Sequence, residues 1–430
     1  MNRLAESQTE ALAGPLQAPE SVPDVGVPKN FLEDLVLKIL YLAGPLWLLE
    51  LAERTRLSVR VIDELFRRLR KEQLCEVTGM SGNVPHIAIT SQGRSRALEL
   101  LSLNQYTGPA PVPWESYVHQ VRIQSVRNVV AHPPDIQRAF AHLVLDDKTL
   151  TQLGTALNSG TSIFLYGPTG AGKTTIAETL PQVFAQDRIW LPFAVEVDGQ
   201  VIAVYDPHVH KSVNEPTPLK GDGRWVLCQR PTVLVGGELT IEMLDLQFNP
   251  VTKFYSAPVQ MKANDGVLII DDFGRQRLRP EELLNRWVVP LDRKIDFLTL
   301  AGGKKIEVPF ELLVVFATNL DPAGLVDPAF LRRIQTKIKV NTVSESQFQE
   351  IFRRVCSDHG LQCDADIVDG LISEIRDKQK EPLRACYPRD IVNQVCWAAR
   401  YEGKERRLDR EAVMRAAEAY FLPLTEQADN

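Results

Sequence analysis

The fold of this chain is decided by the stretch Gly167-Pro168-Thr169-Gly170-Ala171-Gly172-Lys173-Thr174-Thr175. The apolar run at 162–166 before it predicts a buried strand, and the residues at 175–180 after it predict a helix. A glycine-rich turn that ends in Lys-Thr between a strand and a helix is typical of a phosphate-binding P-loop. Its glycines let successive backbone N–H groups turn toward an anion, and the N-terminus of the helix adds positive potential. The stretch therefore predicts an α/β domain whose residues 167–175 bind a nucleotide.

Two side chains of the stretch have a predicted role in ATP chemistry. Lys173 would reach the β- and γ-phosphates, and the hydroxyl of Thr174 would ligate Mg²⁺. A second apolar run, 267–270, ends in Asp271-Asp272, and a buried strand that ends in acid is the second element of such a site. Asp271 is predicted to hold Mg²⁺ directly or through its waters, and Asp272 to orient and deprotonate the attacking water. The cofactors that the sequence predicts are thus ATP and Mg²⁺.

The composition is that of an ordinary globular protein and narrows the cellular context. The 430 residues have a hydrophobic fraction of 44%, a charged fraction of 24% and a formal net charge of −6. A chain of this length has room for about three domains, and its charge gives no overall attraction to nucleic acid. The six cysteines form no C-x-x-C pair, which favours a reducing compartment. With no apolar run of membrane-spanning length and no leader-like N-terminus, we expect a cytoplasmic protein that does not bind membranes.

Shifts of composition and periodicity divide the chain into segments. The N-terminal residues are rich in Pro, Ala, Glu and Gly without an apolar period, which predicts a disordered tail. A later stretch with three prolines and a glycine predicts a semi-stiff linker and marks the clearest boundary. The predicted segments are a tail at 1–29, a helical domain at 30–104, the linker at 105–114, an α/β domain at 115–341 with a β-rich insertion at 188–264, and a helical domain at 342–424.

The domain at 30–104 is predicted to contain three helices, two strands and a closing helix. Apolar pairs recur at helical spacing from Phe31, Ser58 is an N-cap residue for the third helix, and 75–78 and 86–89 alternate like strands. This order resembles a winged helix-turn-helix domain. The third helix carries five basic residues, which are Arg60, Arg67, Arg68, Arg70 and Lys71. Two interpretations stay open: contact of residues 58–94 with DNA, or docking of a protein on this helix.

A third apolar run, 312–317, ends in Thr318-Asn319 and is followed by Asp327-Pro328-Ala329-Phe330-Leu331-Arg332-Arg333-Ile334. Together with the P-loop and the acidic strand end, these motifs resemble those of AAA+ ATPases. The resemblance implies that Asn319 is the first sensor, which helps to align the water. It also implies that Arg332 or Arg333 acts as an arginine finger in the active site of a neighbouring subunit. The other interpretation of the two arginines is that they are surface charges at the C-terminus of a helix.

The chain becomes helical after Asn341, and this part resembles the AAA+ helical lid. Tyr387-Pro388-Arg389-Asp390 is similar to the start of the sensor-2 helix of that family, so the resemblance places Arg389 near the γ-phosphate. Proline and aspartate in a first turn are also good helix-start residues without any ligand. One position departs from the family, because Asp272 stands where the family usually has glutamate. Aspartate reaches one methylene less far, which predicts slow hydrolysis.

Two further segments bear on the branch of the family and on its client. Alternating runs at 295–300 and 304–308 around a Gly-Gly turn predict a β-hairpin, which resembles the presensor-1 hairpin of the branch with MoxR-type chaperones. The aromatic residues of the insertion either contact a substrate at the pore of a ring or form the core of the insertion. They are Trp190, Phe193, Tyr205, Trp225, Phe248, Phe254 and Tyr255. The pair His208 and His210 lacks the further ligands that a metal site needs.

The resemblance predicts an AAA+ ATPase with a parallel sheet, a C-terminal helical lid and an N-terminal winged-helix domain. Because an arginine finger acts only from a neighbouring subunit, we expect a ring of identical chains, a hexamer, that remodels a protein or nucleoprotein client. Two alternatives stay open. One is a DNA-binding regulator or loader that ATP controls, and the other is a scaffold that binds ATP without hydrolysing it.

Overall fold

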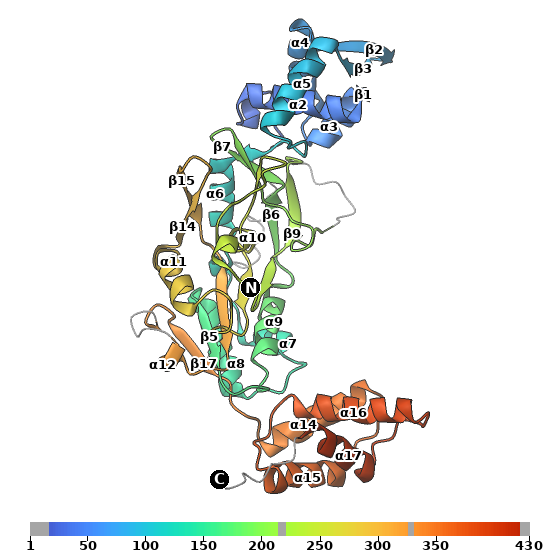
Figure 1. Cartoon of the computed structure of the whole chain (residues 1–430), viewed down its shortest axis with the longest axis vertical. Helices are drawn as coiled ribbons and strands as arrows, with labels where there is room; N and C mark the ends of the chain where they lie inside the picture. The colour runs from blue at the N-terminus through green and yellow to red at the C-terminus, as the bar shows by residue number, and fades with distance from the viewer. Residues whose placement is uncertain (1–16, 214–220, 326–330, 422–430) are drawn as a thin grey trace, which may run out of the picture. The chain divides into compact units, whose positions relative to one another are not determined.

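The computed structural model describes residues 17–213, 221–325 and 331–421 (Figure 1). Its elements form two compact units, and each unit is assembled from separate stretches of the chain. The first comprises the described residues up to Val129, together with Phe184–Leu268 and Gln276–Val314. The second comprises Val130–Val183, Ile269–Arg275 and the described residues from Val315 onward. No helix in the described ranges combines the length and the apolar character that crossing a membrane requires.

A five-stranded sheet carries the P-loop. Its strands lie in the order β10 (Thr232–Val235), β13 (Val267–Ile270), β16 (Leu313–Thr318), β5 (Ile163–Tyr166) and β17 (Thr336–Lys339). The strands β16 and β17 both pair with β5 in parallel. Every residue of β13 and β16 is buried, which is the pattern of strands covered on both faces. The three apolar runs that the sequence predicted as strands are therefore adjacent to one another or one strand apart in one sheet.

Aromatic packing joins the ends of these strands in the second unit. The rings of Phe164, Phe273 and Phe316 are buried, and their centroids lie 5.9, 6.0 and 5.0 Å apart. Helix α9 (Lys173–Thr179) starts directly after the P-loop, and α7 (Pro133–Ala139) and α8 (Asp147–Ser159) precede β5. The short α12 (Pro322–Leu325) follows β16.

The C-terminal part of the second unit is helical, as predicted. Its helices are α14 (Glu345–Asp358), α15 (Ala365–Ser373) with a π-helical turn at Glu374–Lys378, α16 (Tyr387–Tyr401) and α17 (Arg410–Tyr420). Phe348 and Phe352 lie one turn apart on the buried face of α14 and belong to one apolar core with residues of α15, α16 and α17. The Oγ of Ser344 accepts a hydrogen bond from the N–H of Gln347 at 3.2 Å and so caps α14.

The first unit begins with a small helical region. It contains α2 (Lys29–Ala43), β1 (Leu46–Trp47), α3 (Leu48–Thr55), α4 (Val59–Lys71), β2 (Cys75–Ser81), β3 (Val84–Ile89) and α5 (Ser91–Leu103). The three strands form an antiparallel sheet in the order β1-β3-β2. Ser58 caps α4 by accepting a hydrogen bond from the N–H of Val61, as its sequence position predicted.

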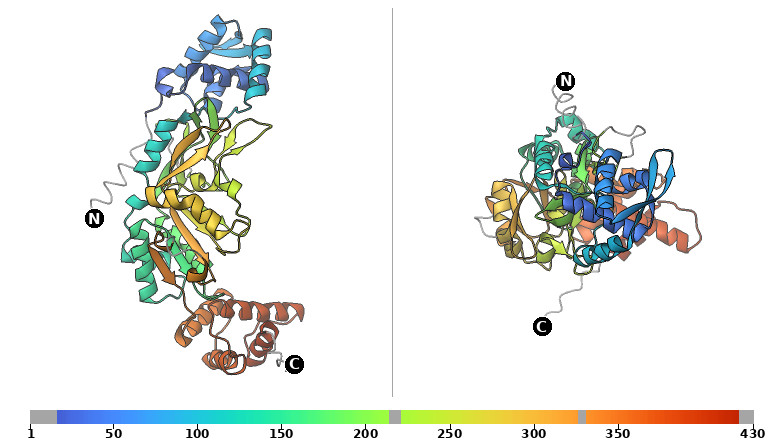
Figure 2. Two further views of the ribbon diagram at one scale, coloured as in Figure 1. Left: turned by 60° about the vertical axis from the view of Figure 1, so that its left-hand side comes forward. Right: turned by 90° about the horizontal axis from the view of Figure 1, so that it is seen from above.

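The remainder of the first unit is rich in strands. A five-stranded sheet has the order β11 (Gln247–Phe248), β12 (Tyr255–Ser256), β8 (Gln200–Ala203), β7 (Ala194–Val197) and β4 (Val112–Pro113). Two further pairs are β6 (Arg188–Pro192) with β9 (Trp225–Gln229), and the hairpin of β14 (Ile295–Thr299) with β15 (Lys305–Pro309). Helix α11 (Pro280–Arg293) lies beside this hairpin (Figures 1 and 2). The helices α6 (Trp114–Ile123) and α10 (Val259–Lys262) complete the unit.

Three predicted boundaries need correction. Residues 17–29 are not a disordered tail, because Val22, Val25 and Val27 are buried in the core that α2–α5 form. The proline-rich stretch is not a free linker, since the N–H of Ala110 bonds to the carbonyl of Thr55 at 2.8 Å and 112–113 form the edge strand β4. Strand β10 lies within the predicted insertion at 188–264, yet it belongs to the sheet of the P-loop. In the first two cases composition concealed a few apolar residues that are enough to pack.

Candidate functional site

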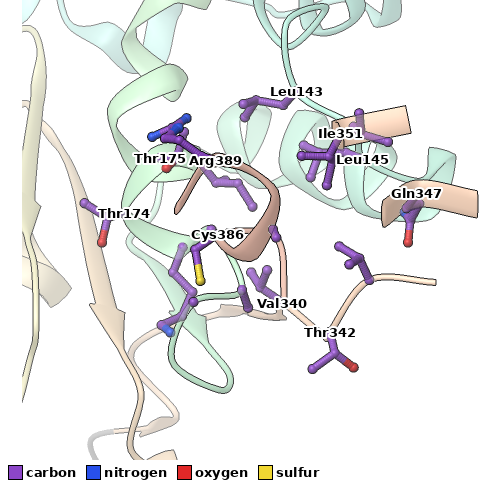
Figure 3. A pocket seen from close by; sticks show the side chains of 18 of the residues that line it. Leu143, Leu145, Thr174, Thr175, Val340, Thr342, Gln347, Ile351, Cys386 and Arg389 are labelled. Carbon is purple, nitrogen blue, oxygen red and sulfur yellow. The ribbon is translucent and has the colours of Figure 1, made fainter. Parts of the chain in front are cut away.

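One cavity of about 400 Å³ lies in the second unit and collects most of the predicted site residues. The P-loop residues 169–175, the acidic pair Asp271 and Asp272, Asn319 and Arg389 line it. The remaining wall comes from the loop 142–146, the stretch 340–343 and one face of α14. Figure 3 shows Thr174 on one side of the cavity, and Leu145, Ile351 and Gln347 on the opposite side. The cavity thus has a polar end at the P-loop and an end with apolar side chains.

The backbone of the P-loop adopts conformations that require glycine. Gly167, Gly170 and Gly172 have φ angles of 148°, 76° and 93°. A Cβ atom on Gly167 would lie 2.0 Å from the carbonyl oxygen of Val340, so a larger residue does not fit. The loop ends where α9 begins, at Lys173, and therefore meets the positive end of a helix. These features make the loop a cradle for phosphate oxygens.

Lys173 is 9% exposed, and its ammonium group is held within the loop. Its Nζ donates hydrogen bonds to the carbonyl oxygens of Gly167 at 3.0 Å and Pro168 at 2.8 Å. Burial lowers the pKa of Lys173, while the charges of Asp271 and Asp272 act to raise it. The ammonium group therefore lies in a partly desolvated position beside the cavity, where it can bind an anion strongly.

Thr174 and Asp271 lie together at the polar end. The hydroxyl of Thr174 donates to Oδ1 and Oδ2 of Asp271, at 3.1 and 2.9 Å. Asp271 follows β13 directly, and the N–H of Asp272 bonds to its Oδ1 at 2.9 Å. A hydroxyl and a carboxylate at this separation are oxygen ligands of the kind that Mg²⁺ prefers. The donor set predicted for the metal is thus brought together.

Asp272 itself is exposed and has a backbone φ of 49°. This left-handed conformation is uncommon for residues other than glycine, although aspartate tolerates it better than most. Such conformations occur at functional sites because the surrounding structure holds them in place. Asp272 lines the same cavity as Lys173, as its predicted role requires.

Asn319 reaches the P-loop because of the order of the strands. Strand β16 lies between β13 and β5, so the residue that follows it emerges between the acidic pair and the loop. The Nδ2 of Asn319 donates to Oγ1 of Thr169 at 3.1 Å. Its Oδ1 is buried and accepts no hydrogen bond in the described structure. Buried acceptors normally receive a hydrogen bond, so we expect this oxygen to accept one from a water molecule or from a phosphate-bound group that carries a proton.

The helical C-terminal part also contacts the P-loop. The N–H of Cys386 donates to the carbonyl oxygen of Gly170 at 3.2 Å, and a Cβ on Gly170 would lie 2.6 Å from the sulfur of Cys386. Arg389 follows in the first turn of α16, is exposed and lines the cavity. Figure 3 shows its side chain beside Thr175. The structure therefore brings Arg389 to the cavity that the sequence predicted for it.

The two candidate finger arginines are not among the described residues that line this cavity. Arg332 is exposed and Arg333 is half-buried. The motif residues before them, 327–330, lie outside the described residues. Within its own chain, neither arginine therefore contributes to the wall around the P-loop.

The sequence predicts that the segment through Ser159 packs beside the nucleotide and supplies an adenine pocket, but no residue in it is diagnostic. Its helical patches were expected at 136–144 and 150–157, whereas α7 ends at Ala139 and a loop follows. In that loop Leu143 and Leu145 are half-buried and line the cavity opposite Ile351 of α14. One signal could have found the loop, because Asp146 is an N-cap residue that accepts from the N–H of Thr149 at 2.6 Å.

Two other sequence candidates have structural explanations. The ring of His210 is buried, and its nitrogens bond to the N–H of Asp206 at 2.8 Å and to the carbonyl of Lys262 at 2.9 Å. No group of three or more metal-ligating side chains occurs among the described residues. Of the aromatic residues in the insertion, Trp190, Trp225 and Tyr255 are buried, which favours the core interpretation.

Comparison with known proteins gives one family match and several matches of fold. A family model described as a domain of unknown function (DUF8689) matches residues 344–419, which contain the helices α14–α17. No curated protein sequence matches the chain. A structure of NtrX from Brucella abortus in complex with ADP is 15% identical, with a TM-score of 0.38. That match covers 64% of this chain and 56% of NtrX, so the chain spans little more than half the length of NtrX.

Two further solved structures come from Thermotoga maritima. The RuvB Holliday junction branch migration motor is 15% identical with a TM-score of 0.37, and the match covers 64% of this chain and 69% of RuvB. Domain III of the replication initiation protein DnaA is 14% identical with a TM-score of 0.36, and the match covers 70% of this chain and 98% of that domain.

Proposed function

We propose that the chain is an ATPase of the AAA+ class, in which the cavity beside the P-loop binds ATP together with Mg²⁺. The observation that carries this proposal is the contact between Thr174 and both carboxylate oxygens of Asp271, next to Lys173. These three side chains come from two different strand ends, and local packing alone does not require them to meet. The glycine conformations of the loop support the same conclusion, because they leave the backbone open to phosphate oxygens.

Each residue then has a definite task. The P-loop N–H groups and Lys173 would bind the phosphates, and Thr174 and Asp271 would hold Mg²⁺, which would supply positive charge beside the terminal phosphoryl group. Asp272 accepts a proton from the attacking water, and the free Oδ1 of Asn319 orients that water. Arg389 is placed to contact the terminal phosphate from α16. Aspartate in place of the usual glutamate holds the water less closely, so slow turnover is expected.

The positions of Arg332 and Arg333 support a ring in which neighbouring chains share the site. Neither lines the cavity of its own chain, and Arg332 is exposed, as a residue that acts in a neighbouring subunit must be. We propose that the ring is a hexamer of the branch with MoxR-type chaperones and that it remodels a protein or nucleoprotein client. The β14–β15 hairpin at the predicted position supports this branch.

Release of phosphate from ATP by the purified chain tests the proposal, with Asp272→Asn as the matched control. This substitution keeps the shape of the side chain and removes the base, so ATP should bind while turnover falls about 100-fold. Equal phosphate release by both proteins would show a contaminating activity. ATP binding without release by either would favour the non-hydrolysing scaffold.

We propose a second function for the region α2–α5, which is to dock a protein client. Its order of helices and strands resembles that of a winged helix. Residues 30–104 contain ten basic and nine acidic residues, so the region has no large positive potential. The hairpin at 75–89 contains neither lysine nor arginine. A winged helix that reads DNA needs an excess of positive charge, which is lacking here.

Contacts on α4 favour the same conclusion. Arg60 pairs with Glu20 at 2.9 Å, Arg67 with Asp63 at 2.6 Å, and Arg68 with Glu33 at 2.8 Å; these partners offset much of the positive charge of the helix. In addition, the hydroxyl of Ser58 donates to the carbonyl of Pro19 at 2.8 Å, so the segment before α2 lies at the start of α4.

A gel shift with the full chain and mixed-sequence duplex DNA at low salt separates docking from DNA binding. We expect no shift. A shift whose affinity falls steeply with salt would instead support the DNA-binding regulator or loader, because phosphate contacts release counterions.

A further inference from the structure

The apolar end of the cavity is held by an arginine that no motif singles out. Arg354 lies on α14, and its Nη1 donates to the carbonyl oxygens of Ala141 at 2.8 Å and Leu143 at 3.4 Å. Its Nε donates to Oε1 of Glu350 at 2.6 Å. We propose that Arg354 positions the loop 140–146 and thereby determines which nucleobase the site prefers. This inference rests on the proposed ATPase function.

The loop supplies one wall for a flat ring. It connects α7 to α8 without regular structure. The N–H of Leu143 bonds to the carbonyl of Phe140 at 2.9 Å, Nε2 of His142 lies 3.4 Å from Oγ1 of Thr179, and Asp146 caps α8. The side chains of Leu143, Leu145 and Ile351 line the cavity and are half-buried. Figure 3 shows Leu145 and Ile351 close together, away from Thr174. An aromatic base between these side chains would bury the apolar surface that they still expose.

Arginine suits this position because of its geometry. Its planar fork presents several N–H groups at fixed angles, so one side chain can bond to a carboxylate and to backbone carbonyls at once. Glu350 fixes the near side of the fork. Hydrogen bonds from Arg353 and Arg354 lower the pKa of Glu350 to about 2, so its carboxylate remains charged throughout the working pH range. The carbonyls of Ala141 and Leu143 therefore accept hydrogen bonds from an arginine of α14 whose other partner, Glu350, stays charged.

Arg353 provides a natural control. It donates to the same Glu350, with Nε and Nη2 both at 2.8 Å from a carboxylate oxygen. Its side chain is 62% exposed, against 37% for Arg354, and its hydrogen bonds go to Glu350, whereas Arg354 also bonds to the loop 140–146. The two neighbouring arginines thus share a partner and differ in whether they reach the base wall.

The phosphate end does not depend on Arg354. Lys173 bonds to carbonyl oxygens of the P-loop, and Thr174 bonds to Asp271 at the end of β13. Loss of Arg354 should therefore weaken binding of the base and leave binding of the phosphates intact. Global unfolding would weaken both, and this difference makes the inference testable.

The experiment measures binding of ATP, GTP and inorganic tripolyphosphate, each with Mg²⁺, to the full chain by calorimetry. The proteins are the natural chain and the variants Arg354→Ala, Arg354→Lys and Arg353→Ala. For Arg354→Ala we expect about tenfold weaker ATP binding, tripolyphosphate binding within about twofold of the natural chain, and a smaller difference between ATP and GTP. Arg354→Lys should behave in the same way, because an ammonium group cannot replace the fork. Arg353→Ala should leave all three affinities unchanged.

Three results would overturn the inference: equal weakening of ATP and tripolyphosphate, no change in either, or an equal effect of Arg353→Ala. If Arg354→Ala does not fold, the binding of ATP and tripolyphosphate by Arg354→Lys provides the same comparison. A natural chain that binds neither ATP nor tripolyphosphate would contradict the proposed ATPase function itself. A natural chain that binds both and fails only the comparison of variants would contradict the role of Arg354 alone.

Discussion

Lys173 and Lys38 are both buried lysines, and they illustrate how little burial says about function. Lys173 is 9% exposed and Lys38 is 3% exposed. Each donates to backbone carbonyls, since Nζ of Lys38 bonds to the carbonyl of Asn104 at 3.1 Å. Burial lowers the pKa of both, and for Lys38 the value falls to about 8. By burial, bonding and titration alone, the two lysines would be judged alike.

Their surroundings differ. Lys173 lines a cavity together with two carboxylates, and its bonds are to a loop of glycines that can accept an anion. Lys38 lies on α2 and bonds to the residue that ends α5, so it joins two helices. A buried cation thus indicates a binding site only where an open space and counter-charges lie beside it. Lys173 should therefore affect ligand binding, and Lys38 should affect stability.

The largest effect on ATP binding is expected for Lys173→Ala. This substitution removes the cation that faces the phosphates, and it should weaken ATP binding by about 100-fold or more, since truncating one partner of a buried charge pair costs several kcal/mol. Calorimetric titration with ATP and Mg²⁺ measures this loss. The melting temperature should stay within a few degrees, because the lysine serves a site and not the core. A collapse of the melting temperature without ligand would show that the two lysines are alike after all.

The next prediction concerns ATP turnover and the two arginines that do not line the cavity of their own chain. Replacement of Arg332 and Arg333 together by alanine should leave ATP affinity unchanged and reduce turnover about 1000-fold, which is the scale of a lost arginine finger. Phosphate release at saturating ATP measures it. Mixing this double variant with Lys173→Ala sharpens the test, because each inactive chain lacks what the other retains. Recovery of turnover in the mixture is expected if neighbouring chains share a site, and full activity of the double variant alone would contradict that arrangement.

Most of the polar end of the site could be predicted from the sequence. The P-loop, Asp271, Asp272 and Asn319 each follow a recognisable apolar strand, and sheet formation brings strand ends together. The order of helices and strands in α2–α5 could also be predicted, because each element carries its own caps and periodicity. In these cases each sequence signal lies within one short segment, and folding brings the segments together.

The individual residues of the apolar end could not be predicted in this way, although the segment through Ser159 was expected to lie beside the nucleotide. Arg354 and Ala141 are 213 positions apart, and nothing in either neighbourhood announces the other. The burial of Val25 was hidden for a similar reason, since its partners lie in α2–α5 and its own segment reads as a tail. Composition describes a segment in isolation, whereas burial depends on what the segment meets. Contacts between segments that are far apart in the sequence could therefore be identified only from the structure.

The smallest effect is expected for Lys38, and it should appear only in the dependence of stability on pH. The folded-state pKa of Lys38 is about 8 because of burial, which Asp34 partly opposes, and the ordinary value is 10.5. Between these values the unfolded chain binds more protons, so stability should rise as pH increases from 8 to 10.5, by at most on the order of 3 kcal/mol. Below pH 8 both states carry the proton and the contribution is constant.

Other lysines titrate in the same window, so the difference between the natural chain and Lys38→Met isolates this group. Thermal melts at pH 7.5, 9 and 10 should show a steeper rise for the natural chain, with ATP affinity equal in both proteins. An equal rise of the melting temperature with pH in the two proteins, or a loss of ATP binding in Lys38→Met, would remove the distinction between the structural and the functional lysine.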